Sequence, residues 1–185
     1  MKPLVALLMF AVIVPGAPGA ESARPSPAYN IQRVDAPAIS LSQYRGKVVV
    51  LAFIHTTCSH CQQLTTDMIP LAKEYAPRGV QFLECAFNDD AMAALPEFLQ
   101  RFSPPFPVGY GSTASVLAYL QRTLTDPRPM YVPQIVFLDR AGVIRGKFSA
   151  DEPFFGDAPA SIRTQLEKLL TTAHTAPAKA PSKKK

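Results

Sequence analysis

The chain has 185 residues and a formal net charge of +5 at pH 7, a length that corresponds to one ordinary domain with short appendages. Lys2, Lys179, Lys183, Lys184 and Lys185 supply five of the 19 basic residues, so the remaining 14 equal the 14 acids in number. The body of the protein is therefore neutral, and its composition excludes a nucleic-acid-binding surface.

The N-terminal residues 1–20 have the pattern of a signal peptide. Lys2 precedes an eleven-residue apolar core, Leu4–Val14, and small residues lead up to Ala20. A bilayer takes about 20 apolar residues to span, so this core is too short to cross one. We therefore expect a periplasmic or secreted protein, with membrane contact only through an uncleaved N-terminus.

Composition divides the rest of the chain into three parts. Residues 21–28, rich in Pro and Ser, are expected to be a linker, residues 29–172 one folded domain, and residues 173–185 a disordered basic tail. Within the domain, residues 29–34 and 38–41 alternate in polarity and predict a β-hairpin at the edge of a sheet.

The first half of the domain predicts a strand, a helix and a second strand. Residues 48–54 form a short apolar run, typical of a strand that is buried on both faces. A helix over about residues 58–76 should follow, with a bend at Pro70. Gly79 ends this helix and residues 80–87 form the next strand, which is the order of a right-handed βαβ unit.

The second half begins with two further helices. Residues 91–102 predict a helix with a break or a late start at Pro96. Residues 103–108 contain three prolines and should be irregular and extended. Ser112 is then the expected cap of a helix that runs to about Arg122, before a loop that leads to Pro133.

The C-terminal third of the domain predicts a hairpin and a last helix. Residues 134–138 and 143–148 are expected to form a hairpin around a turn with the sequence DRAG. Residues 151–159 should form a loop, and residues 160–172 have apolar side chains at helical spacing.

A C-x-x-C motif follows directly after the first buried strand. With Thr57 as the N-cap, Cys58 lies in the first helical turn and Cys61 one turn later on the same face, where the two can form a disulfide. The positive end of a helix favours a thiolate at Cys58 and lowers such pKa values from about 8.5 to roughly 3.5–7.5. We therefore expect Cys58 to attack, Cys61 to resolve the mixed disulfide, and His60 to add a neighbouring cation.

Pro133 is the second indication of chemistry. It precedes an expected central strand, a position from which Pro is otherwise excluded. A cis bond there would turn the backbone of Val132 outward, leaving its polar groups to pair with an incoming peptide beside Cys58.

These features together identify a resemblance to a known family. The apolar strand, the turn FIHTTCSHC and the later segment VPQIVFLDRAG resemble the thioredoxin-like superfamily, in particular its exported TlpA/ResA-like thiol–disulfide oxidoreductases, over residues 29–172. The resemblance implies an α/β, thioredoxin-like fold: a central mixed sheet flanked by helices, with an N-terminal β-hairpin extension. It also implies that Cys58 and Cys61 are the redox pair and that Pro133 is the cis-proline facing them. Substrates would be cysteine-containing proteins, electrons would come from a redox partner protein, and no organic cofactor or metal is expected.

The chain departs from that family at three positions. Thr57 stands where the family usually has Trp before the first cysteine. Ala52 and Leu64 occupy the two positions at which members of the family carry an acid near the redox pair. The sequence therefore identifies no proton acceptor for Cys61.

Metal transfer is the main alternative function. His55, Cys58, His60 and Cys61 fall within seven residues, and thiolate with imidazole suits Cu(I) or zinc. Copper proteins of the Sco kind, however, resemble C-x-x-x-C with a distant His. The distant His of this chain is His174, in the expected tail.

Peroxide reduction is a second alternative, because peroxiredoxins share the fold. Their motif resembles P-x-x-x-T/S-x-x-C, and the corresponding positions before Cys58 hold Leu51 and His55 in place of the proline and the hydroxyl. The third cysteine, Cys85, lies in an apolar run and is expected to be a buried free thiol that packs as a small hydrophobe.

Overall fold

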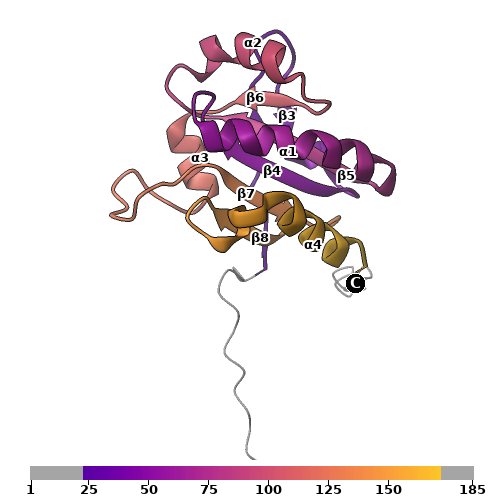
Figure 1. Ribbon diagram of the computed structural model, residues 1–185. Coiled ribbons are helices and arrows are strands. Elements are labelled where there is room, and N and C mark those ends of the chain that lie inside the picture. The colour runs from indigo at the N-terminus through magenta and orange to yellow at the C-terminus, as the bar shows by residue number, and fades with distance from the viewer. Residues whose placement is uncertain (1–22, 172–185) are drawn as a thin grey trace, which may run out of the picture.

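The computed structural model describes residues 23–171, which fold around a six-stranded sheet of order β1-β8-β7-β4-β5-β6 (Figure 1). A separate two-stranded sheet pairs β2 with β3. The expected signal peptide, residues 1–20, and the expected tail, residues 173–185, lie outside the described residues. Within the described range, none of the helices has the length and apolar character that crossing a membrane requires.

The large sheet is mixed, as expected. Its central strand, β4, pairs in parallel with β5 and antiparallel with β7, and all seven of its residues are buried. Apolar side chains on both faces explain this burial, because each face is covered by other elements. The strands are β1 (Arg24–Pro25), β4 (Val48–Ile54), β5 (Val80–Ala86), β6 (Val108–Tyr110), β7 (Gln134–Leu138) and β8 (Val143–Ser149).

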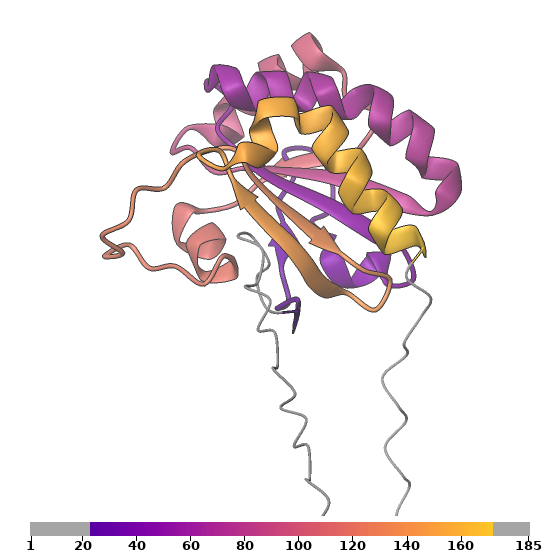
Figure 2. The ribbon, with the colours of Figure 1, turned by 60° about the horizontal axis from the view of Figure 1, so that its bottom comes forward.

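Alternate residues of β4 face two apolar clusters. Val50 and Ala52 belong to the cluster that contains the inward faces of α1, α2 and α4, whereas Leu51 belongs to the cluster with α3 and the N-terminal hairpin. Helices α1 and α4 lie side by side on one face of the sheet (Figure 2). The helices are α1 (Ser59–Tyr75), α2 (Ala91–Phe102), α3 (Thr113–Tyr119) and α4 (Ala158–Thr171), and the α/β layering is the one that the sequence predicts.

The N-terminal hairpin is present but small. Strands β2 (Asn30–Ile31) and β3 (Ile39–Ser40) have two residues each and join the large sheet through an isolated bridge between Gln32 and Tyr110. The segment expected to be a linker also contributes a strand, because β1 pairs antiparallel with β8. Pro25 is tolerated in β1 because this strand is at the edge of the sheet, where a missing N–H costs little.

The break or late start expected at Pro96 is wrong, because helix α2 is continuous through this proline. Helix α1 continues through Pro70, as expected. Each proline leaves the carbonyl four residues earlier without its helical partner, and those residues, Thr66 and Met92, are exposed so that water can bond to them.

Three expected boundaries are wrong by a few residues. Helix α3 ends at Tyr119 and not near Arg122, because Gln121 adopts a φ of 56° and the N–H of Arg122 donates back to the Leu117 carbonyl at 2.8 Å. The stretch 103–108, expected to be irregular and extended, ends one residue earlier than expected, because Val108 begins the short strand β6. The expected loop 151–159 contains the 3-10 helix η3 (Pro153–Asp157), and α4 starts directly after it.

The packing of α4 generates a test of the fold. Replacing the fully buried Leu166 with Ala should lower the free energy of unfolding by about 2–5 kcal/mol, because it leaves a cavity under the helix. Urea denaturation measures this change. Leu124→Ala, at a side chain that is 75% exposed, is the control and should change stability by less than about 0.5 kcal/mol. Equal effects of the two substitutions would contradict the position of α4.

Candidate active site

The turn between β4 and α1 carries the C-x-x-C motif. Cys58 is the N-cap of α1, with extended backbone (φ −78°, ψ 122°), and the helix begins at Ser59. The sequence placed the cap one residue earlier, at Thr57. The difference arises because the carbonyl of Cys58 accepts the first helical bond, from the N–H of Gln62 at 3.0 Å.

The two cysteines differ in exposure. Cys58 is half-buried at the surface end of the helix, and Cys61 is completely buried one turn further in. The backbone N–H of His55 donates to the Sγ of Cys61 at 3.4 Å. An external sulfur therefore has access to Cys58 and not to Cys61.

The environment of Cys61 favours its neutral thiol. Burial raises the pKa of the Cys61 thiol far above its ordinary range, and the nearby Cys58 and Glu84 raise this pKa further. The hydrogen bond from the His55 N–H acts in the opposite direction. Cys61 thus needs a proton acceptor in order to become a nucleophile.

Pro133 lies opposite the first cysteine. The Val132–Pro133 peptide bond is cis, as the sequence predicted. The carbonyl oxygen of Val132 is 4.0 Å from the Sγ of Cys58. The fold therefore brings together Cys58, Cys61, Val132 and Pro133 from segments that are more than 70 positions apart in the chain.

Asn88 fixes the turn and was missed as a site residue, because in sequence it appears only as a helix cap. Its Oδ1 accepts from the N–H of Thr56 at 3.0 Å, and its Nδ2 donates to the hydroxyl of the same residue at 3.0 Å. Gln62 donates to the Thr56 carbonyl at 2.8 Å. Its position just after β5 could have identified Asn88 as a site residue, because parallel strands end at the same edge of a sheet and the cysteine turn follows the parallel strand β4. Thr57 itself is exposed.

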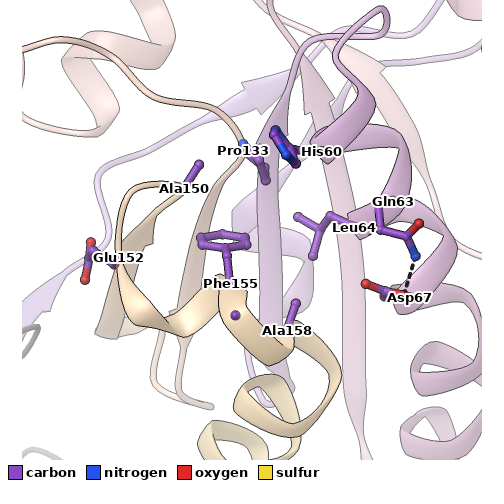
Figure 3. A pocket seen from close by; sticks show the side chains of 10 residues that line it. His60, Gln63, Leu64, Asp67, Pro133, Ala150, Glu152, Phe155 and Ala158 are labelled. Atoms are coloured by element: carbon purple, nitrogen blue, oxygen red, sulfur yellow. Dashed lines mark hydrogen bonds between the residues drawn. The ribbon is translucent and has the colours of Figure 1, made fainter.

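The two histidines of the turn have separate environments. His55 packs against Phe87, with ring centroids 4.4 Å apart, and its burial lowers its pKa in spite of the opposing effect of Asp89. His60 is exposed and points toward Pro133 (Figure 3). Among residues 23–171, no three His, Cys, Asp or Glu side chains come together in a way that could hold a metal ion.

A pocket of about 300 Å³ adjoins the cis-proline. Leu64 and Phe155 form its apolar wall, His60 and Pro133 lie at the end near the cysteines, and Asp67 lies on the helix at the opposite end (Figure 3). Phe155 belongs to η3, and the preceding Phe154 is buried against Phe148. The pocket therefore offers an apolar surface beside the exposed thiol.

Glu84 is the second residue that the sequence analysis missed. It lies in the middle of β5, is completely buried, and neighbours Ala52 in the register of the parallel strands. Its Oε1 accepts from the hydroxyl of Thr65 at 2.8 Å, and its Oε2 has no hydrogen-bonding partner within the described residues. The sequence feature that could have identified Glu84 is an acid inside the apolar run FLECAF.

Burial also sets the protonation of Glu84. Burial raises the pKa of this carboxyl from 4.5 to about 8, and the hydrogen bond from Thr65 only partly opposes the shift. The folded protein therefore holds a proton there that the unfolded chain loses above pH 4.5. The contribution of this group to folding is fully present below that value and is lost as the pH rises to about 8.

Glu84→Gln should reduce the pH dependence of stability. Each unit of pKa difference corresponds to about 1.4 kcal/mol, so the wild-type protein should lose several kcal/mol more than the variant between pH 4.5 and pH 8. Urea denaturation at a series of pH values gives both curves. Parallel curves for the two proteins would show that Glu84 titrates normally in the folded state.

Comparison with known proteins identifies the family. Residues 21–164 match the Redoxin family. No curated protein matches the chain in sequence. The fold, in contrast, is shared with many solved structures, including the three described below, which are distant in sequence.

Three of these structures are thiol–disulfide proteins by description. The chain is 20% identical to a thioredoxin-family thiol:disulfide interchange protein from Chlorobium tepidum (TM-score 0.63; 79% of this chain and 98% of that one). It is 16% identical to a thiol:disulfide interchange protein from a Bacteroides species (0.64; 84% and 94%). It is 15% identical to the thioredoxin domain of a thiol-disulfide oxidoreductase from Bacteroides vulgatus (0.61; 84% and 99%). The expected thioredoxin-like fold is thereby confirmed, and the chain belongs to the Redoxin family.

Proposed function

We propose that the protein is a thiol–disulfide oxidoreductase that exchanges a Cys58–Cys61 disulfide with cysteines of partner proteins. The observation that carries this proposal is the pairing of an accessible thiol at a helix N-terminus with a buried thiol one turn behind it. Cys58 is the N-cap of α1 and is only half-buried, so a substrate sulfur can reach it, whereas Cys61 is completely buried. The two roles, attack and resolution, follow from this difference.

The reducing direction has two steps. The thiolate of Cys58 attacks one sulfur of a substrate disulfide, a mixed disulfide forms, and the other substrate sulfur leaves as a thiolate. Cys61 then loses its proton and attacks the Sγ of Cys58. The substrate is released with two thiols, and the protein keeps the two-electron oxidised Cys58–Cys61 disulfide. In the oxidising direction the same steps run backwards.

The surface around Cys58 suits an extended peptide. The backbone of Val132 lies beside the thiol and is the expected partner for the substrate backbone. Thr57 is on the exposed rim of the same turn, and the adjoining pocket with Leu64 and Phe155 can take a neighbouring apolar side chain. His60, which lines this pocket near Pro133, is positioned to act on the negative charge of the attacking or leaving thiolate.

We further propose that the exchange takes place outside the cytoplasm, in the periplasm or after secretion. This rests on the signal peptide expected from residues 1–20 and on the C-x-x-C motif in an exported context. A redox partner protein would restore the starting state of the cysteine pair, and no organic cofactor is required for the steps above.

The alternative functions have less support. A Sco-like copper site would need His or acidic ligands around the cysteines, and none of the described side chains forms such a group. A peroxiredoxin would need a proline and a hydroxyl residue where this chain has Leu51 and His55. No contact in the described structure favours either reaction over dithiol exchange.

Cysteine substitutions test the two roles. Cys58→Ser should abolish exchange, and Cys61→Ser should accumulate covalent mixed disulfides with substrates, because the resolving thiol is gone. Non-reducing electrophoresis with mass spectrometry in the native host detects the adducts. Cys85→Ala is the matched control and should exchange as wild type does, because Cys85 lies in the apolar cluster on the opposite face of the sheet. If Cys61→Ser captures nothing, the proposed exchange reaction is wrong.

The reduction potential tests the couple itself. The metal-free protein equilibrated against glutathione should show a two-electron couple between about −270 mV, typical of reductants, and about −120 mV, typical of strong oxidants. A value near either end assigns the direction of the reaction. Failure to form the intramolecular disulfide at any ratio of oxidised to reduced glutathione would contradict the oxidoreductase function.

A further inference from the structure

We propose that Glu84 is the proton carrier of Cys61, giving a proton to its sulfur when the disulfide opens and accepting it when the disulfide closes. The inference rests on the proposed dithiol exchange and adds a residue from a different strand to that reaction. Glu84 would be the proton acceptor that Ala52 and Leu64, at the two family positions for an acid, cannot be.

Strand register places Glu84 beneath the first turn of α1. Glu84 on β5 pairs with Ala52 on β4, and both side chains face the cluster that contains Cys61. Thr65 of α1 lies within hydrogen-bonding distance of the Glu84 carboxyl. The Glu84 side chain therefore extends from β5 toward the helix that carries Cys61.

Thr65 links the carboxyl to the cysteine. Its hydroxyl lies 2.8 Å from Glu84 Oε1 and 3.1 Å from the carbonyl oxygen of Cys61. The single proton of that hydroxyl can go to Glu84 Oε1 or to the Cys61 carbonyl, so the neutral acid can hold its own proton on either oxygen. The carboxyl is held in place through Thr65, and its Oε2 has no partner among the described residues.

Packing alone gives no reason for an acid at this position. Apart from Thr65, whose hydroxyl lies 2.8 Å from Oε1, an apolar cluster packs on this face of the sheet, so Leu or Met would fill the space without an unpaired buried oxygen. A buried polar atom that lacks a partner is a recurrent sign of a functional group. Glu84 is also the one carboxyl that acts electrostatically on the Cys61 thiol.

The neighbouring elements contribute few competing groups. The thiols that α1 contributes are Cys61 and, at the surface, Cys58. Strand β4 ends before His55, whose backbone N–H donates to Cys61 Sγ. Strand β6 ends at Tyr110. The buried side chains of α2 include Leu95 and Phe98, which are apolar. The charged side chains of α2, Glu97 and Arg101, are exposed.

The proton balance is simple in both directions. When a substrate thiolate attacks Cys58, the Cys58–Cys61 bond breaks and Cys61 leaves with the electron pair. Glu84 gives its carboxyl proton to that sulfur and becomes a carboxylate, which solvent later reprotonates. When Cys61 attacks the mixed disulfide, its proton moves to the carboxylate of Glu84. Burial raises the pKa of Glu84 to about 8, so both of its forms are accessible near neutral pH.

The test compares Glu84→Gln with wild type in the full chain. The rate constant for reduction of the Cys58–Cys61 disulfide by dithiothreitol is measured across the neutral and mildly alkaline range. The variant should react roughly 100-fold more slowly, in the range of general acid–base effects, and should lose an inflection near pH 8. Glu84→Asp, which keeps the acid, should retain an inflection.

Glu97→Gln is the matched control, because it removes an exposed acid from the adjacent helix, and it should keep both the rate and the inflection. A wild-type rate and inflection in Glu84→Gln would overturn the proton-carrier role while leaving the exchange reaction intact. Absence of any exchange in the wild-type protein would instead reject the proposed function itself.

A second measurement needs no variant and covers the case in which Glu84→Gln does not fold. Carbon-13 NMR of the carboxyl groups gives the titration of Glu84 in the oxidised and the reduced wild-type protein. The titration midpoint should be higher in the reduced form, because a thiolate nearby disfavours a second negative charge. Identical midpoints in the two forms would refute the coupling between Glu84 and the cysteine pair.

Discussion

The burial of strand β4 on both faces positions every other part of the site. Parallel pairing with β5 brings the end of that strand, and Asn88 after it, to the edge where the cysteine turn begins. Antiparallel pairing with β7 brings the start of that strand to the same edge, because Phe53 is opposite Gln134. Three distant segments therefore meet at one point, and the turn needs only the bonds between Thr56 and Asn88 to be fixed there.

The parts of the structure with a strong local pattern could be predicted from the sequence. The apolar run 48–54, the C-x-x-C motif at the start of a helix and the proline before a strand predict the βαβ unit and the facing of Pro133 and Cys58. Strand β1 and the single bridge of the hairpin have too few residues to produce a period, so they could not be recognised. The N-cap of α1 is one residue later than the sequence predicts. Thr57 and Cys58 both suit the position, and only the backbone geometry distinguishes them.

Glu84 shows a different limit of sequence reasoning. Its partners, Thr65 and Cys61, are 19 and 23 positions away, and only the parallel register brings them together. A search for an acid at the family positions therefore fails, although a buried acid exists one strand away. The site contains a buried thiol and a buried carboxyl whose pKa values are both raised by burial, and Glu84 raises the pKa of the Cys61 thiol further.

The alternation of side chains along β5 has a consequence for which disulfide the folded chain can form. Three cysteines allow three different pairings in an unfolded oxidised chain. Glu84 and Cys85 are consecutive, yet they point to opposite faces, so the sheet itself stands between Cys85 and the other two thiols. Once β4 and β5 have paired, one pairing remains sterically accessible within the molecule. The sheet thus prevents disulfides between Cys85 and the other two cysteines within the folded molecule. Such disulfides can form only before β4 and β5 have paired.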